Sequence, residues 1–208
     1  MIEYLVLVPI AYLVGSLPFG LIAGKIVTGT DIRDFGSGKT GMTNVLRTAG
    51  PVPAALVLLL DMGKAVVAVV VARILFDSTG AEAAAAVAVM IGHNWPVFVQ
   101  FRGGRGIASG YGGLLILSWP AFIVATLVGV SLIAGTRYVS LGSITAAVLG
   151  SLALIITAAT GHAPMAYIWF GVFGTALVVV RHKDNIHRLL QGTEPKIGQR
   201  ANLAVDSQ

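Results

Sequence analysis

The segment from Phe101 to Ser109 holds the residues best suited to chemistry. It reads Phe-Arg-Gly-Gly-Arg-Gly-Ile-Ala-Ser, so Gly103, Gly104 and Gly106 flank Arg105. Glycines let backbone N–H groups converge on an anion, and a helix that begins just after them points its positive end at that anion. Arginine can meet two phosphate oxygens at once. The pattern indicates a phosphate-binding loop. The alternative is an interfacial turn whose arginines contact lipid headgroups.

Three further polar segments carry basic and hydrogen-bonding residues. The first extends from Gly36 to Arg47, the second begins at Arg137 and includes Ser140 and Ser143, and the third follows Arg181. Two phosphorylated substrates would need several cations and backbone donors, and these segments could supply them. The side chains that could take part are those of Ser37, Thr43, Asn44, Arg47, Arg137, Ser143, His182 and Asn185, with Gly38 in the backbone.

Composition places these segments in a membrane protein. Of 208 residues, 56% are apolar and only 11% are charged. The apolar residues form blocks that could cross a hydrocarbon core, which takes roughly 20 helical residues. A chain without cysteine has no disulfide, thiolate nucleophile or thiolate-bound metal. The sequence predicts one all-α, polytopic domain with blocks near 4–27, 51–76, 83–101, 107–136, 141–159 and 164–180.

The block at 107–136 decides the number of spans. Read as one helix, it gives six spans and places Arg137 opposite the glycine–arginine loop. Read as two helices broken at Ser118–Trp119–Pro120, it gives seven spans and gathers every basic loop on one side. The positive-inside rule favours seven, with the N-terminus outside and the C-terminus inside. Each half then offers only about 12 to 16 residues, fewer than an ordinary span.

Two charges interrupt the second apolar block. Asp61 and Lys64 are three residues apart, so they share a helix face and can pair. Charges at mid-bilayer are costly, and such residues usually face a polar interior. They could form a structural ion pair between helices, or support the floor of a polar site. His93, before Pro96, could belong to the same support or simply cap its helix.

Several motifs together resemble one family. The segment from Gly36 to Arg47, the glycine–arginine loop and the segment from Arg181 to Glu194 are similar to three motifs of the bacterial acyl-phosphate-dependent glycerol-3-phosphate acyltransferases, the PlsY type. Further matches in order are Gly15–Ser16–Leu17–Pro18–Phe19–Gly20, Asp61 with Lys64, Gly92–His93 with Pro96, and Tyr138–Val139–Ser140–Leu141 with Ser143.

The resemblance implies an enzyme of the bacterial inner membrane whose active site faces the cytoplasm. It would transfer a fatty acyl group from acyl phosphate to the sn-1 hydroxyl of glycerol 3-phosphate, giving lysophosphatidic acid and inorganic phosphate. The expected partners are these substrates and membrane lipids, without cofactor, metal or nucleic acid. Residues 1–194 would form the transmembrane domain and 195–208 a polar tail.

The resemblance also assigns roles to residues. Ser37, Arg47, Arg105, His182 and Asn185 would be catalytic. Asp61, Lys64 and His93 would support the site. The substrate-binding residues would be Gly38, Thr43, Asn44, Gly103, Gly104, Gly106, Ser109, Arg137 and Ser143.

Four positions depart from the family pattern. Lys39 stands where the family usually has asparagine, and Met42 where it usually has alanine. Arg105 replaces a lysine and Ser109 a threonine, which keeps the cation and the hydroxyl. The role of Lys39 therefore stays open. So does the acceptor of the hydroxyl proton, for which His182, Asp61 and the donor's own phosphate are candidates; we favour the phosphate. His182 should have a lowered pKa because it adjoins Arg181 and Lys183.

Two functions of other classes fit parts of the sequence. A small-anion transporter would use the charged pair in the second block, although the basic residues gather at one face and no internal repeat is visible. A lipid-binding structural subunit would use the basic face for anionic headgroups, which leaves the glycine spacing unexplained. The sequence also lacks a His-Glu-x-x-His motif and the His-x-x-x-x-Asp pair of another large acyltransferase class.

Overall fold

The structure is a computed structural model that describes residues 2–198, and over these residues it is all-helical. The longer helices are α1 (Ile2–Gly15), α2 (Phe19–Thr28), α4 (Pro51–Phe76), α5 (Thr79–Asn94), α6 (Ile107–Leu117), α7 (Trp119–Thr136), α8 (Val139–Ala159) and α9 (Tyr167–Arg181). The connections hold two short helices, α3 (Met42–Thr48) and α10 (Lys183–Leu190), and two 3₁₀ turns, η1 (Ile32–Asp34) and η2 (Val97–Val99). The expected fold class is confirmed.

Within residues 2–198, five helical segments are long and apolar enough to cross a membrane. They are α1 with α2, α4, α5, α7 and α8, and α6 and α9 are shorter apolar helices. The seven apolar segments match the expected set. The count of true spans and the orientation of the termini remain predictions from the sequence.

Two breaks in the apolar segments have clear causes. Pro18 separates α1 from α2, because proline cannot supply the N–H that a continuous helix needs. Ser118 alone separates α6 from α7, and Pro120 occupies the first turn of α7, where proline is tolerated. The predicted break at Ser118–Trp119–Pro120 is therefore present. The two halves differ more than expected, with 11 residues in α6 and 18 in α7.

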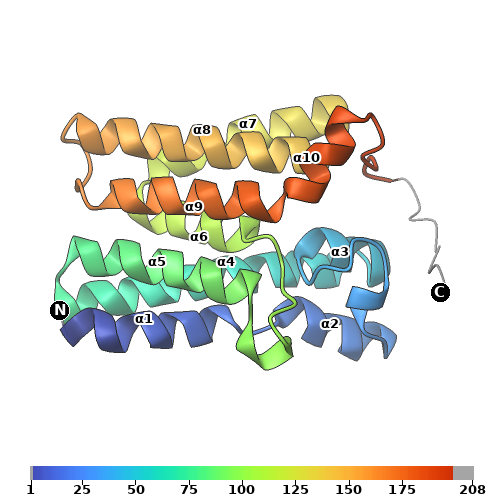
Figure 1. The fold of residues 1–208 in the computed structure, drawn as a ribbon, viewed down its shortest axis with the longest axis horizontal. Helices are drawn as coiled ribbons and strands as arrows, with labels where there is room; N and C mark the ends of the chain where they lie inside the picture. Colours follow the sequence, from blue (N-terminus) through green and yellow to red (C-terminus); the bar gives the residue numbers. More distant parts are fainter. Residues whose placement is uncertain (1, 199–208) are drawn as a thin grey trace.

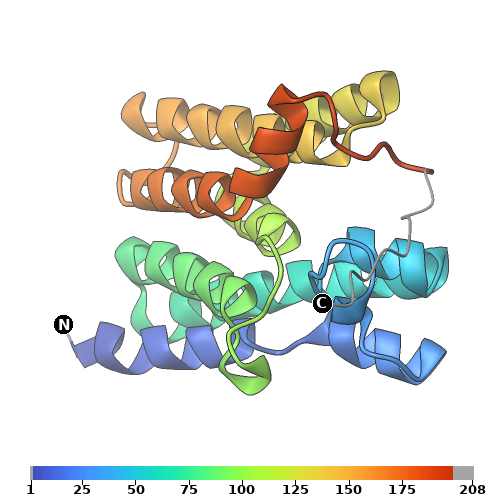
Figure 2. The ribbon, with the colours of Figure 1, turned by 45° about the vertical axis from the view of Figure 1, so that its right-hand side comes forward.

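The helices form two layers with α6 between them. Figures 1 and 2 show α1, α2, α4 and α5 on one side and α7, α8, α9 and α10 on the other. Helix α6 contacts α4 and α5 as well as α7, α8 and α9. Small residues permit this close packing; a Cβ on Gly112, for example, would meet the backbone of Met62 in α4. The glycine–arginine loop precedes α6, so both layers surround that loop.

A paired charge cluster closes the end of the bundle where α4 meets α5. Glu82 is buried, and its Oε2 accepts hydrogen bonds from Arg73 NH2 at 2.7 Å and from the Tyr167 hydroxyl at 2.7 Å. Arg73 also donates to the carbonyl of Ile116, near the end of α6. The predicted apolar block at 83–101 had left Glu82 outside the helix. That was wrong, because Ser78 caps α5 and starts the helix earlier.

The C-terminal segment returns to the helices after α10. The backbone N–H of Ile197 donates to the carbonyl of Arg137, and the Arg137 guanidinium donates to the carbonyl of Ile197 at 2.8 Å. Residues 195–198, at the start of the expected tail, thus lie against the turn between α7 and α8. The rest of that tail, 199–208, lies outside the described residues.

Candidate active site

A cavity of about 1440 Å³ lies at the end of the bundle where α5 ends and α6 begins. Its polar wall comes from the loop that precedes α3, from the glycine–arginine loop, and from α10 with the residues after it. A further wall is apolar and comes from α4, α6 and α7. It includes Leu58, Met62, Tyr111, Phe122, Val130 and Ile133.

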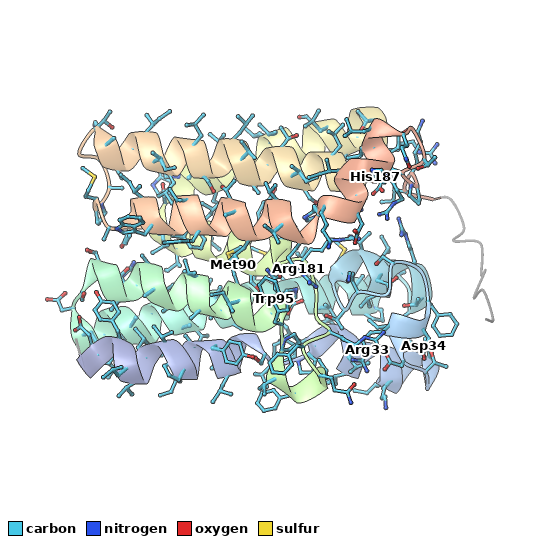
Figure 3. All side chains as sticks on the ribbon, in the orientation of Figure 1. Arg33, Asp34, Met90, Trp95, Arg181 and His187 are labelled. Atoms are coloured by element: carbon cyan, nitrogen blue, oxygen red, sulfur yellow. The ribbon has the colours of Figure 1, made fainter. Side chains whose placement is uncertain are left out.

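The glycine–arginine loop is held from outside the cavity by Arg181. The Nε and NH2 atoms of Arg181 donate to the carbonyl of Gly104 at 3.1 and 2.9 Å, and its guanidinium lies 5.1 Å from the ring centre of Trp95. Figure 3 shows these two side chains beside each other between α5 and α9. Carbonyl groups near an anion site would repel the anion, so this contact holds the Gly104 carbonyl away from a ligand. The N–H of Gly104 is also engaged, because it donates to the carbonyl of His93 at 3.0 Å, and the loop residues that line the cavity are Arg105 and Gly106.

His93 packs against Gly104 of the same loop. Lys64 Nζ lies 2.8 Å from Asp61 Oδ1, donates to His93 Nδ1 at 2.8 Å and donates to the Gly15 carbonyl at 2.9 Å. An ammonium group can only donate, so Nδ1 of His93 must accept and Nε2 carries the proton. A Cβ on Gly104 would lie 2.1 Å from that Nε2. Only glycine fits there.

This arrangement decides between the readings of the buried charges. The expected pair of Asp61 and Lys64 is present, and both side chains are buried. His93 joins the pair, and its ring is not a helix cap. Asp61 and His93 line the cavity, whereas Lys64 stays behind them. The three residues form the cavity floor, as one interpretation of the sequence predicted. Although Asp61 lies deep in α4, it is part of the cavity lining.

Asn44 shapes the loop before α3. Its buried amide nitrogen donates to the carbonyls of Ile32, Phe35 and Lys39, and its Oδ1 accepts from the N–H of Ser37 at 3.2 Å. All four of these hydrogen bonds are to backbone atoms of the loop. The expected substrate-binding residue Asn44 lines the cavity together with Ser37 and Arg47, but its amide is engaged in fixing the loop.

His182 lies between α9 and α10 and faces the cavity. Its Nδ1 is 2.8 Å from the carbonyl of Val178, which can only accept, so Nδ1 carries the proton and Nε2 is free to accept. Burial lowers the pKa of His182 to about 4, and the positive charge of Arg105 acts in the same direction. The predicted lowering of the His182 pKa is confirmed, but its main cause is burial and not the charges of the neighbouring residues in the sequence.

Glu194 holds Asn185 in place. Asn185 Nδ2 donates to Glu194 Oε1 at 2.6 Å, and Arg188 Nε donates to Glu194 Oε2 at 2.8 Å. Burial acts to raise the pKa of Glu194, but hydrogen bonds, those from Asn185 and Arg188 among them, lower it overall. With its nitrogen engaged, Asn185 keeps a buried Oδ1 without a hydrogen-bond partner among residues 2–198. Asn185 and His182 thus offer two acceptors to a ligand's hydroxyl groups.

Three cations face the cavity without partners in the described part of the chain. Lys39, Arg47 and Arg105 line it and come from the loop before α3, from α3 and from the glycine–arginine loop, and none makes a hydrogen bond or an ion pair there. Arg105 Nε is fully buried. Burial lowers the pKa of Arg105 to about 10, which still leaves the guanidinium charged at neutral pH. Unpaired, partly buried cations are unfavourable alone and are stabilised by an anion.

The sequence-predicted residues divide into two sets. Those that line the cavity are Ser37, Thr43, Asn44, Arg47, Asp61, His93, Arg105, Gly106, Ser143, His182 and Asn185. Those outside the lining are Gly38, Lys64, Gly103, Gly104, Ser109 and Arg137. Ser109 is buried in the first turn of α6, and its hydroxyl has no partner within residues 2–198. Arg137 is exposed, and its guanidinium contacts Ile197.

Sequence reasoning missed two positioning residues, Arg181 and Glu194. Both belong to the third motif, which was the only available signal. Their partners, the Gly104 carbonyl and the Asn185 amide, could not be read from that motif. As for metals, residues 2–198 contain no group of three or more histidine or acidic side chains that could hold an ion.

The fold and this cavity define a polytopic helical membrane protein with a buried, cationic site for anionic ligands beside an apolar wall. The family model described as "Glycerol-3-phosphate acyltransferase" matches residues 5–192. The chain belongs to this glycerol-3-phosphate acyltransferase family.

Relatives and solved structures agree with the family assignment. A glycerol-3-phosphate acyltransferase of Gloeobacter violaceus is 48% identical over 92% of this chain and 93% of its own length. One of Desulforamulus reducens is 45% identical over 91% and 93%. The crystal structure of the integral membrane glycerol 3-phosphate acyltransferase PlsY (YgiH) in its glycerol 3-phosphate form has a TM-score of 0.86 at 35% identity, covering 94% of this chain and 96% of that one. Its lysophosphatidic acid form has a TM-score of 0.84 at 34% identity, with 94% and 95% covered.

Proposed function

We propose that this chain transfers a fatty acyl group from acyl phosphate to the sn-1 hydroxyl of glycerol 3-phosphate. The products are lysophosphatidic acid and inorganic phosphate. The observation that carries the proposal is the set of unpartnered cations, Lys39, Arg47 and Arg105, around a cavity that also has an apolar wall. Two phosphates and one acyl chain are the ligand groups that such a cavity suits.

The size of the cavity supports two substrates. Sites for single small ligands usually measure roughly 300–1,000 Å³, and this one measures about 1440 Å³. Arg105 would hold the phosphate of the donor. Arg47 and Ser37 would hold the phosphate of glycerol 3-phosphate, and His182 Nε2 and Asn185 Oδ1 would accept from its hydroxyl groups. Apolar side chains such as Leu58 and Phe122 would line the first part of the acyl chain.

The reaction needs no cofactor because the donor is a mixed anhydride. The sn-1 oxygen forms a bond to the acyl carbon, and the bond between that carbon and the bridging phosphate oxygen breaks. The electron pair of that bond leaves with the phosphate, which also takes the hydroxyl proton. A neutral His182 with a pKa about 4 is a weak base, which supports the phosphate as the proton acceptor. The residues then act by orientation and by neutralising negative charge.

A direct assay tests the proposal. The purified protein in detergent is given acyl phosphate and labelled glycerol 3-phosphate, and parallel reactions contain an acyl thioester as donor. We expect labelled lysophosphatidic acid and one phosphate released per acyl group, with acyl phosphate only. Turnover with the thioester alone would reject the proposed donor. A transporter or a lipid-binding subunit would form no product with either donor.

The site would face the cytoplasm of a bacterial cell. The basic loops support this placement, because loops rich in lysine and arginine stay on the cytoplasmic side. With the N-terminus outside, a tag at Ser118–Trp119 should be accessible from outside and a tag at Arg137 from inside. If both tags were accessible from the same side, the proposed topology of the transmembrane domain, residues 1–194, would be rejected.

A further inference from the structure

Lys39 has a fixed backbone and a side chain that faces the cavity. Asn44 Nδ2 donates to the Lys39 carbonyl at 2.9 Å, and the next carbonyl, that of Thr40, packs so closely on Gly20 that a Cβ there would clash. The side chain is half-buried and belongs to the cavity lining. The fixed backbone and the half-buried side chain together keep the Lys39 ammonium group near the site, unlike that of an exposed surface lysine.

The surroundings of Lys39 are mainly cationic. Burial lowers the pKa of its ammonium group, the positive charges of Arg181, Arg105 and Arg102 lower it further, and Asp184 acts in the opposite direction. Within residues 2–198 the ammonium group has no ion pair or hydrogen bond. Several like charges around one cavity repel each other, and a bound dianion would relieve this repulsion. The arginines named here belong to or hold the glycine–arginine loop.

The other lysines of the described chain differ from Lys39. Lys64 is paired with Asp61 and lies behind the cavity. Lys196 also lines the cavity, but its ammonium group lies 5.2 Å from the ring centre of Tyr138. Lys25 and Lys183 are exposed and do not line the cavity. Lys39 is thus distinguished by its position and its missing partner together.

We infer that Lys39 binds the phosphate of the acyl donor together with Arg105, and binds inorganic phosphate there after transfer. This inference rests on the proposed function and adds one cation to the donor site. A lysine ammonium is a compact charge with three donors and needs no fixed fork geometry. It can therefore stay on the phosphate as that group changes from part of the mixed anhydride to a free ion.

The test compares Lys39→Gln with Lys183→Gln, which makes the same charge change at an exposed site nearby. Lys39→Gln should raise both the KM for acyl phosphate and the inhibition constant for inorganic phosphate about tenfold, as expected for one lost charge-assisted hydrogen bond. The KM for glycerol 3-phosphate should stay within about twofold, and Lys39→Arg should retain most of the donor affinity because the charge is kept. Lys183→Gln should change none of these values.

A measurement without turnover completes the test. Inorganic phosphate should raise the midpoint of thermal unfolding less in Lys39→Gln than in the wild type, while the midpoints without phosphate agree. If Lys39→Gln behaves like Lys183→Gln, or raises only the KM for glycerol 3-phosphate, the inference is wrong. A lower midpoint without phosphate would also reject it and make Lys39 a structural residue. Failure of the wild type itself to use acyl phosphate would reject the proposed function instead.

Discussion

The two ends of the helix bundle use the same kinds of side chain in different ways. At one end, Arg73 is paired with Glu82, and Tyr167 completes the cluster. At the other end, Arg47 and Arg105 line a cavity and have no partner within residues 2–198. A paired cation contributes to holding helices together, whereas an unpaired one leaves its charge for a ligand. Within residues 2–198 the cavity end also has paired cations, such as Arg188 with Glu194, so what distinguishes it is its additional unpaired cations and not the type of residue.

The strongest test of this comparison removes an unpaired cation. Arg105→Ala should lower kcat/KM at least about 100-fold, as for other lost groups that stabilise developing charge. The thermal midpoint should not fall, because no protein group loses a partner. Arg105→Lys should keep a good part of the activity, since the charge remains. Activity of Arg105→Ala close to that of the wild type would show that the glycine–arginine loop is only a lipid-facing turn.

The next test concerns an uncharged group at the same end. His182→Gln should raise the KM for glycerol 3-phosphate about tenfold and change kcat little, because glutamine keeps a hydrogen-bonding side chain. His187→Gln, at an exposed position of α10, is the control. A fall in kcat of about 10³ or more at unchanged KM would instead make His182 the general base.

At the paired end, a substitution should affect stability alone. Glu82→Gln should lower the free energy of unfolding by about 1–3 kcal/mol, less than for a fully buried pair because the Arg73 side chain is 44% exposed. The folded fraction should keep its activity per molecule. Asp77→Asn, a matched change at an exposed acid, should be neutral. A loss of activity in folded Glu82→Gln would contradict the separation of the two ends.

The last test concerns pH. The pKa of His182 is about 4 in the folded state, against an ordinary value of 6.5. The unfolded chain binds more protons between these values, so stability should fall as pH decreases from 6.5 toward 4, by up to about 3 kcal/mol. His182→Gln should remove this part of the pH dependence, and His187→Gln should retain it. Equal pH profiles for His182→Gln and the wild type would show that His182 does not contribute.

Much of the fold was predictable because the relevant signals are local. The apolar block at 51–76 became α4 without change, and Pro18 and Pro120 marked real breaks. The start of α5 was missed because its first turn is small and polar, so hydropathy placed Glu82 outside the helix. The contact of Glu82 with Tyr167 depends on α9, which is distant in the sequence.

The site was predictable in its residues but less so in its contacts. Motifs identified Arg105, His182 and Asn185, which the fold does bring to one cavity. The motifs could not show that Asn44 binds its own loop or that Arg137 contacts Ile197, because both contacts depend on tertiary geometry. For the same reason the partnerless state of Lys39 became visible only in the folded chain.

The length of α6 has a further consequence for the kinetics. Its 11 residues extend about 16 Å, roughly half of a hydrocarbon core about 30 Å thick. If the glycine–arginine loop binds acyl phosphate as proposed, its place at the end of so short a helix would let it meet the donor without drawing methylene groups into water, each of which would cost about 0.8 kcal/mol. The effective donor concentration is then its mole fraction in the bilayer. At a fixed bulk amount of acyl phosphate, added inert lipid should slow turnover by surface dilution.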